Sequence, residues 1–176
     1  MADRKRRWIF PVVLAAWPYL FLLPMLLPGQ SETAVTVFYA VYLALTAAVY
    51  IVNIVNAWTW PAEQAPALAF WNMLVKLIHV PFYLGVFAVG VLSALAMVVP
   101  ALLLASPILI ATLFVVDALL MLTTSMYGMA AAGKAWRRGR LCGAAALLLR
   151  ALNLLFVADV IASVPLYMML KKTSEV

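Results

Sequence analysis

Long apolar runs, separated by short polar or basic segments, constrain this chain more than any other feature. About 20 apolar residues span a bilayer, and about five runs of that length or longer follow one another. Hydrophobic residues make up 68% of the 176-residue chain, and charged residues only 10%. A soluble domain of this length cannot bury so much apolar surface. The sequence therefore predicts an all-α integral membrane protein, a single bundle of about five transmembrane helices.

The boundaries of these helices follow from the runs and their prolines. Residues 62–73 lengthen the third run beyond one bilayer thickness, so we expect them to lie at the interface. Proline removes a helical hydrogen bond, and Pro81 should kink the long third helix. The first run is longer than a signal-peptide core and lacks a small-residue cleavage site, so we expect it to be retained. The predicted spans are residues 9–27, 34–57, 74–99, 107–129 and 145–170.

Basic residues set the expected orientation. Arg4–Arg7 and Lys134–Arg140 flank apolar spans, which indicates topology anchors on the cytoplasmic side and not nucleic-acid binding. The N-terminus should then be inside, in the cytoplasmic (cell) membrane. Five spans would leave Lys171 and Lys172 outside, a conflict that a re-entrant segment in the last third would remove. Five tryptophans fall at the predicted inner interface, although the orientation was set by Lys and Arg alone: Trp8, Trp58, Trp60, Trp71 and Trp136.

Ionisable residues within the apolar runs are the strongest functional signal. A charge inside a bilayer costs a few kcal/mol even on lenient scales, so such residues usually face a bundle interior. On the third helix, Lys76 and His79 share one face with Asn72 and Tyr83, within about 60° of each other. Helical depth predicts an inner-half cluster of Asn53, Asn56, Asn72, Lys76, His79, Tyr83 and Ser125.

Asp117 is different, because it lies about 15 Å from the outer loop, near the midplane. That depth disfavours a direct ion pair between Lys76 and Asp117. The last span has two registers, and the sequence leaves both open. In one, Arg150 reaches the level of Asp117, and in the other Arg150 extends toward the inner surface while Asp159 lies near the midplane.

Other chemistries find little support. The chain has one His and one Cys, too few for an ordinary zinc site, and it has no phosphate-binding glycine loop. We therefore expect no metal and no cofactor. An intramembrane enzyme built on Ser125 and His79 is the least favoured alternative. The candidate ligand- or ion-binding residues are Asn53, Asn72, Lys76, His79, Tyr83, Asp117, Ser125 and Asp159.

Two functions remain open. The favoured one is a small transporter, or a substrate-binding membrane subunit, with a polar cavity open toward the cytoplasm. Lys76 and His79 would hold a polar or anionic group, and Asp117, with Asp159, would bind a cation or carry a proton. The chain is short for this role, so a homodimer or a partner membrane subunit is expected. The alternative is a non-enzymatic accessory, assembly or immunity-type protein whose polar residues lock helices together.

Three segments carry a resemblance to a known family. They are Phe70–Tyr83, Ser125–Gly128 and Ala158–Ser163, which read FWNMLVKLIHVPFY, SMYG and ADVIAS. Together they resemble a family of small polytopic membrane proteins of Gram-positive bacteria that has no established activity. The resemblance implies that these residues belong to one site and that the protein lies in a bacterial cytoplasmic membrane.

Overall fold

Helices make up the regular structure of the protein. The computed structural model describes residues 7–27 and 29–172, and no strand occurs in these ranges. Three of the helices are long and apolar enough to cross a membrane, at residues 32–59, 62–96 and 105–137. The elements are α1 (Ile9–Leu20), α2 (Leu23–Leu26), α3 (Glu32–Thr59), the 3₁₀ turn η2 (Ala62–Gln64), α4 (Ala65–Ala96), the 3₁₀ turn η3 (Pro100–Leu102), α5 (Ala105–Arg137), α6 (Gly143–Leu152) and α7 (Ala158–Lys172).

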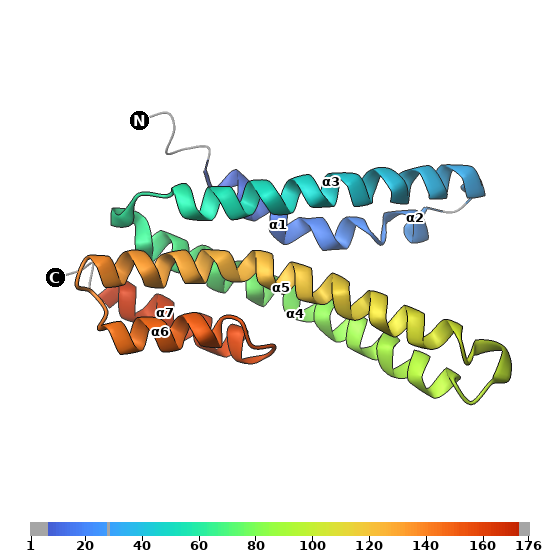
Figure 1. Ribbon diagram of the computed structural model, residues 1–176. Helices are drawn as coiled ribbons and strands as arrows, with labels where there is room; N and C mark the ends of the chain where they lie inside the picture. The colour runs from blue at the N-terminus through green and yellow to red at the C-terminus, as the bar shows by residue number, and fades with distance from the viewer. Residues whose placement is uncertain (1–6, 28, 173–176) are drawn as a thin grey trace.

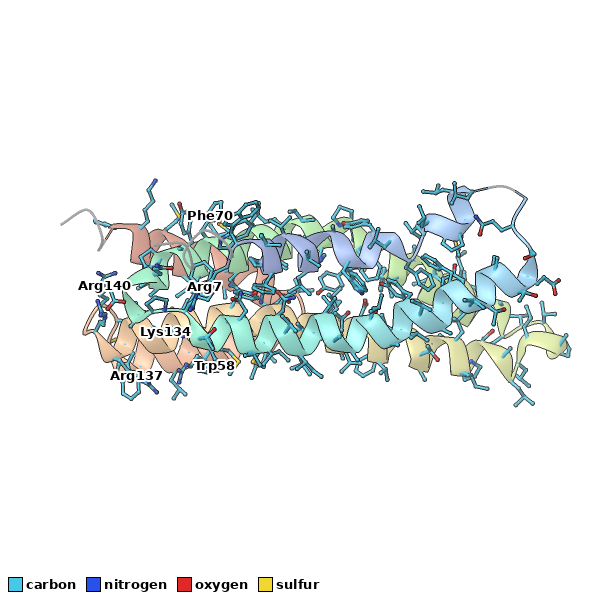
Figure 2. The ribbon with its side chains drawn as sticks, turned by 90° about the horizontal axis from the view of Figure 1, so that it is seen from above. Arg7, Trp58, Phe70, Lys134, Arg137 and Arg140 are labelled. Carbon is cyan, nitrogen blue, oxygen red and sulfur yellow. The ribbon has the colours of Figure 1, made fainter. Side chains whose placement is uncertain are left out.

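The long helices run back and forth between two ends of an elongated molecule (Figure 1). α1 and α2 together run antiparallel to α3, and α4 runs antiparallel to α5. α6 starts where α5 ends, and α7 returns to that same end. We call this the basic end, because Arg7, Lys134, Arg137 and Arg140 lie there (Figure 2).

The core is concentrated in the half of the molecule next to the basic end. α4 packs chiefly against α5 and α7, while α1 and α3 cover the α4–α5 pair from the other side. Leu14, Leu68, Leu120, Tyr127 and Leu166 are fully buried at these contacts. Toward the opposite end, the α1–α3 layer and the α4–α5 pair carry mostly exposed apolar side chains, as lipid-facing helices do.

Local sequence accounts for the helix ends. At the start of α3, the Ser31 hydroxyl accepts a hydrogen bond from the Ala34 amide at 3.2 Å, an N-cap that satisfies one free donor. At the end of α5, Gly139 adopts a φ of 69°. The amides of Gly139 and Arg140 then bond the Trp136 and Ala135 carbonyls at 2.9 and 3.0 Å, which is a Schellman motif.

Several predicted spans differ from the observed helices. Residues 9–27 are divided, because Pro24 has no amide hydrogen to continue the ladder beyond α1. Residues 62–73 and 74–99 are not separate segments, since α4 is continuous from Ala65 to Ala96 with Pro81 inside it. The spans 34–57 and 107–129 lie within α3 and α5, and α5 continues for two further turns.

The largest difference is in the last third. Residues 145–170 were predicted as one span, but they form two short helices joined at residues 153–157. Asn153 ends α6, and Val157 has a φ of 70°, which is rare for a β-branched residue. We call residues 143–172 the α6–α7 hairpin. Pro165 lies inside α7.

Candidate functional site

Lys76 is the centre of a buried polar network. It lies on the face of α4 that packs against α5 and α7, and its side chain is fully buried. Its ammonium group donates to the Asp159 carboxylate at 2.9 Å, to Asn153 Oδ1 at 3.0 Å and to Ser125 Oγ at 3.2 Å. A lysine has three donors, so all three are used. We call Asn72, Lys76, Ser125, Asn153 and Asp159 the Lys76 network.

Asn153 connects the hairpin to the long helices, although sequence reasoning did not select it. Its side-chain nitrogen Nδ2 donates to the Leu149 carbonyl at 2.7 Å, at the end of α6. Its Oδ1 also accepts from Asn72 at 3.3 Å, and its backbone carbonyl accepts from the Ser125 hydroxyl. The available signal was one amide side chain between Leu152 and Leu154 in an otherwise apolar run.

Gly128 makes room for this network on α5. A Cβ atom at this position would come within 2.4 Å of Asn153 Oδ1 and 2.8 Å of Asn72 Nδ2. Only glycine allows the two amide side chains to approach the α5 backbone here. The SMYG segment of the sequence therefore contributes two parts of the network, the Ser125 hydroxyl and the space at Gly128.

The turn of the hairpin bonds part of its own backbone. The Leu154 and Leu155 amides bond carbonyls of α6 at 3.0 and 3.2 Å, and the Asp159 amide bonds the Leu155 carbonyl at 2.9 Å. Asp159 lies in the first turn of α7, where the helix dipole favours a carboxylate. Polar backbone at membrane depth is tolerated when it is internally bonded or buried in protein, and the bonded amides of this turn meet that condition in part.

His79 connects α4 to the first helix and not to the Lys76 network. Its Nε2 lies 3.2 Å from the Leu14 carbonyl oxygen, and the Tyr19 hydroxyl donates to the carbonyl of Ile78, the preceding residue of α4. The His79 Nδ1 has no partner among the described residues. Ser125 bonds Lys76 and Asn153 instead. The Ser125–His79 pair that the least favoured alternative, an intramembrane enzyme, would need is not seen among the described residues.

A second polar cluster joins α3 to α5. The Tyr127 hydroxyl donates to Asn53 Oδ1 at 2.8 Å and accepts from Asn56 Nδ2 at 3.0 Å. All three side chains are buried. Asn53 thus lies in a different cluster from Lys76, because it contacts another face of α5.

Asp117 is buried and Tyr83 is partly buried, and neither side chain is fully bonded. Within the described part of the chain, Asp117 Oδ1 and the Tyr83 hydroxyl have no hydrogen-bond partner. Asp117 is near enough to Tyr83 and to Tyr50 of α3 to affect both electrostatically. The Tyr83 ring packs edge-on against His79 and against Phe156 of the hairpin turn, with centroid separations of 6.2 and 5.6 Å.

The predicted inner-half cluster is therefore divided among three places. Lys76, Asn72 and Ser125 come together, while Asn53 and Asn56 join Tyr127, and His79 contacts α1. The disfavoured Lys76–Asp117 pair is absent from the ion pairs of the described residues, and Lys76 bonds Asp159 instead. Arg150 extends along α5, where its Nε donates to the Met129 carbonyl at 3.3 Å and its guanidinium covers Gly133.

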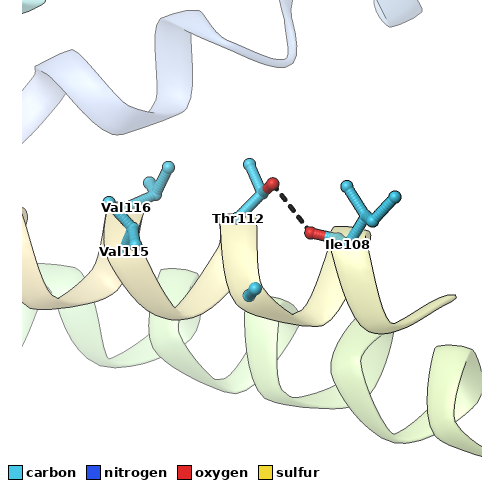
Figure 3. A pocket seen from close by; sticks show the side chains of 5 residues that line it. Ile108, Thr112, Val115 and Val116 are labelled. Atoms are coloured by element: carbon cyan, nitrogen blue, oxygen red, sulfur yellow. Dashed lines mark hydrogen bonds between the residues drawn. The ribbon is translucent and has the colours of Figure 1, made fainter. Parts of the chain in front are cut away.

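Two hollows of the described surface do not reach the Lys76 network. One is an open depression of about 400 Å³ on α5, lined by Ile108, Ala111, Thr112, Val115 and Val116 (Figure 3). The other, of about 170 Å³, lies between α1–α2 and α3 and is lined mainly by apolar side chains such as Trp17 and Phe38. Among the residues described, no group of three His, Cys, Asp or Glu side chains is arranged to hold a metal ion.

The sequence matches a family of unknown function, DUF6652, over residues 8–174. The chain belongs to this family. No curated protein and no solved structure matches it. Membership agrees with the resemblance found in the sequence to a family without an established activity. The three segments that carry that resemblance supply Asn72, Lys76, Ser125, Gly128 and Asp159 to the network described above.

Proposed function

We propose that the protein is a non-enzymatic, multi-pass membrane protein of the accessory or assembly type. The Lys76 network would fix the α6–α7 hairpin against α4 and α5, so that a rigid surface is presented to other molecules in the membrane. One observation carries this proposal. The buried ammonium of Lys76 has three protein acceptors, and Lys76 lines neither of the two hollows described above.

The arrangement in the membrane is part of the proposal. α1–α2, α3, α4 and α5 would each cross, and the α6–α7 hairpin would enter and leave on one side. The basic end would then face the cytoplasm of a bacterial cell, in line with the positive-inside rule. This arrangement removes the conflict of five spans, because Lys171 and Lys172 lie on the same side as Lys134 and Arg137.

Thiol labelling in intact cells tests the orientation. Cys142 is exposed and would first be replaced by serine. A membrane-impermeant maleimide should label Gln30→Cys and should leave Lys172→Cys unlabelled until the membrane is opened. Labelling of both positions from outside would support five crossings and would reject the re-entrant hairpin.

The same chemistry tests whether the network is dry. In the Cys142→Ser background, Ser125→Cys should resist a small, membrane-permeant thiol reagent, because its position is fully buried. The native Cys142 supplies the rate of an exposed thiol. If Ser125→Cys reacts as fast as Cys142, water reaches the network and the proposed locking role is wrong.

Transport remains a second candidate because of Asp117. A buried carboxylate oxygen without a partner in the described residues is the kind of group that carries a proton or binds a cation within a membrane. The wild-type protein in sealed vesicles should then show a proton or sodium flux that Asp117→Asn abolishes. A wild-type flux that persists in Asp117→Asn, or no flux at all, would reject this candidate.

A further inference from the structure

The basic end carries nearly all of the positive charge that the structure describes. Arg7, Lys134, Arg137 and Arg140 lie there together (Figure 2), and α7 ends at the same place with Lys171 and Lys172. The opposite end carries Glu32 in the first turn of α3 and no lysine or arginine among the described residues. This polarity raises the question of which of the basic side chains are used by the protein itself.

Arg7, Lys134 and Arg138, the C-cap residue of α5, are held by protein acceptors. Lys134 donates to the Ala57 and Trp58 carbonyls at 3.2 and 3.0 Å, and Arg7 donates to the Thr59 carbonyl. Both cover the carbonyl end of α3, where the helix dipole attracts cations. Arg138 forms an ion pair with Glu63. These three positions have structural roles and are not free to bind another molecule.

Arg137 and Arg140 differ from them. Neither side chain has a hydrogen bond or an ion pair among the described residues, and Arg140 Nη1 is buried without an acceptor. A buried charged donor without an acceptor costs more than the average hydrogen bond contributes. The Schellman turn at Gly139 lies between the two arginines. An oxyanion is the acceptor that a guanidinium binds best, because its parallel N–H groups match two oxygen atoms.

Two further features indicate where that oxyanion lies. Trp58 and Trp136 are about half exposed, at 46% and 51%, and tryptophans of this kind sit at the level of lipid headgroups. α6 also begins beside Arg140, and its Cys142 N-cap forms no side-chain capping bond. The first amides of α6 therefore add donors at the same level.

We propose that Arg137 and Arg140 bind phosphate groups of anionic phospholipids at the basic end. The inference goes beyond the proposed function and rests only on the membrane orientation given above. Each basic residue near a membrane surface contributes on the order of 1 kcal/mol to the attraction of anionic lipid, which is about fivefold in affinity. Loss of both should therefore weaken anionic lipid binding by about 30-fold at low salt.

The test uses the full chain in nanodiscs that contain either phosphatidylglycerol with phosphatidylcholine or phosphatidylcholine alone. The enrichment of phosphatidylglycerol around the protein is measured by native mass spectrometry of gently released particles. Arg137→Gln/Arg140→Gln should lose most of the enrichment. Arg138→Gln is compared with the single variants Arg137→Gln and Arg140→Gln, because each removes one charge and only Arg138 already has a protein partner. Arg138→Gln should lose much less than either of them.

Thermal unfolding in phosphatidylcholine alone separates binding from folding. The double variant should unfold at the wild-type temperature there, and only the wild type should gain stability when phosphatidylglycerol is added. Equal enrichment in the wild type and the double variant would overturn the proposal, as would a loss in Arg138→Gln equal to that in Arg137→Gln and Arg140→Gln. Neither result would alter the outcome of labelling at Ser125→Cys, so the two proposals can fail separately.

Discussion

Two buried carboxylates of this protein have opposite surroundings. Asp159 lies 2.9 Å from the ammonium of Lys76, and both side chains are at most 3% exposed. Asp117 is also buried, but its Oδ1 has no partner in the described residues. Asp159 joins the α6–α7 hairpin to α4 through this ion pair. Asp117 Oδ1 bonds to no other helix in the described residues. Burial alone therefore does not show which intramembrane charge is structural, whereas the number of bonded partners does.

Removal of Lys76 should cause the largest loss in the free energy of unfolding. Lys76→Met leaves the Asp159 carboxylate buried without its cation, and loss of one partner of a buried pair costs about 3–5 kcal/mol. Reversible unfolding in mixed micelles would measure the loss. Lys76→Met/Asp159→Leu should recover most of it, because an apolar pair of similar volume is tolerated. A single variant as stable as the exposed control Lys172→Met would contradict the structural role of the pair.

Gly128→Ala should have the next largest effect. The added methyl would meet the Asn153 and Asn72 amides, and overpacking of this kind costs about 1–3 kcal/mol. Gly85→Ala is the matched control, since no atom lies within 4 Å of its Cβ position. That control should gain about 0.5–1 kcal/mol from helix propensity. A Gly128→Ala protein as stable as Gly85→Ala would show that Asn153 does not approach α5 as described.

Tyr127→Phe, which changes a cluster that contains neither carboxylate, should cause an intermediate loss in the free energy of unfolding. The change removes two interhelical hydrogen bonds, to Asn53 and Asn56. Such bonds contribute about 0.6 kcal/mol each in membranes, so we expect a loss of about 1 kcal/mol. Tyr167→Phe, which removes a hydroxyl with no hydrogen bond in the described structure, should leave the unfolding free energy unchanged. Equal losses in the two variants would mean that the Tyr127 cluster does not tie α3 to α5.

Asp117→Asn should have the smallest effect on stability, under about 1 kcal/mol, because Oδ1 loses no bonded partner. Asp159→Asn measured in parallel should cost several times more, since it leaves the Lys76 ammonium without its counter-ion. If Asp117→Asn misfolds while Asp159→Asn does not, the roles that we assign to the two carboxylates are reversed.

Much of the fold could be predicted from the sequence because lipid imposes simple rules. The runs that became α3, α4 and α5 were recognisable from apolar length alone, and helical depth correctly disfavoured a Lys76–Asp117 pair. The same arithmetic could not find Asp159 as the partner of Lys76. The Lys76–Asp159 pair forms only because the last apolar run breaks at Asn153. Bonds from Asn153 to Leu149, Ser125 and Lys76 stabilise that break. Two of these residues are distant in sequence, and no proline or glycine marks the turn.

The grouping of polar residues was predicted only in part for a related reason. Helical phase correctly placed Asn72 and Lys76 on one face of α4, but it could not say which neighbour each face would meet. His79, one turn further along, meets the Leu14 carbonyl of α1 instead of the hairpin. Which helix lies against which face depends on packing between segments distant in the chain, and a single sequence does not contain that information.

The α6–α7 hairpin has a consequence for the order of membrane insertion. Asn153 lies at its turn and Asp159 at the start of α7, and the donors that bond them belong to Lys76 of α4 and Ser125 of α5. The hairpin therefore has little reason to enter hydrocarbon before α4 and α5 have paired there. We expect it to insert last, from the side on which it was synthesised, so that in our proposed topology Lys171 and Lys172 never cross the bilayer.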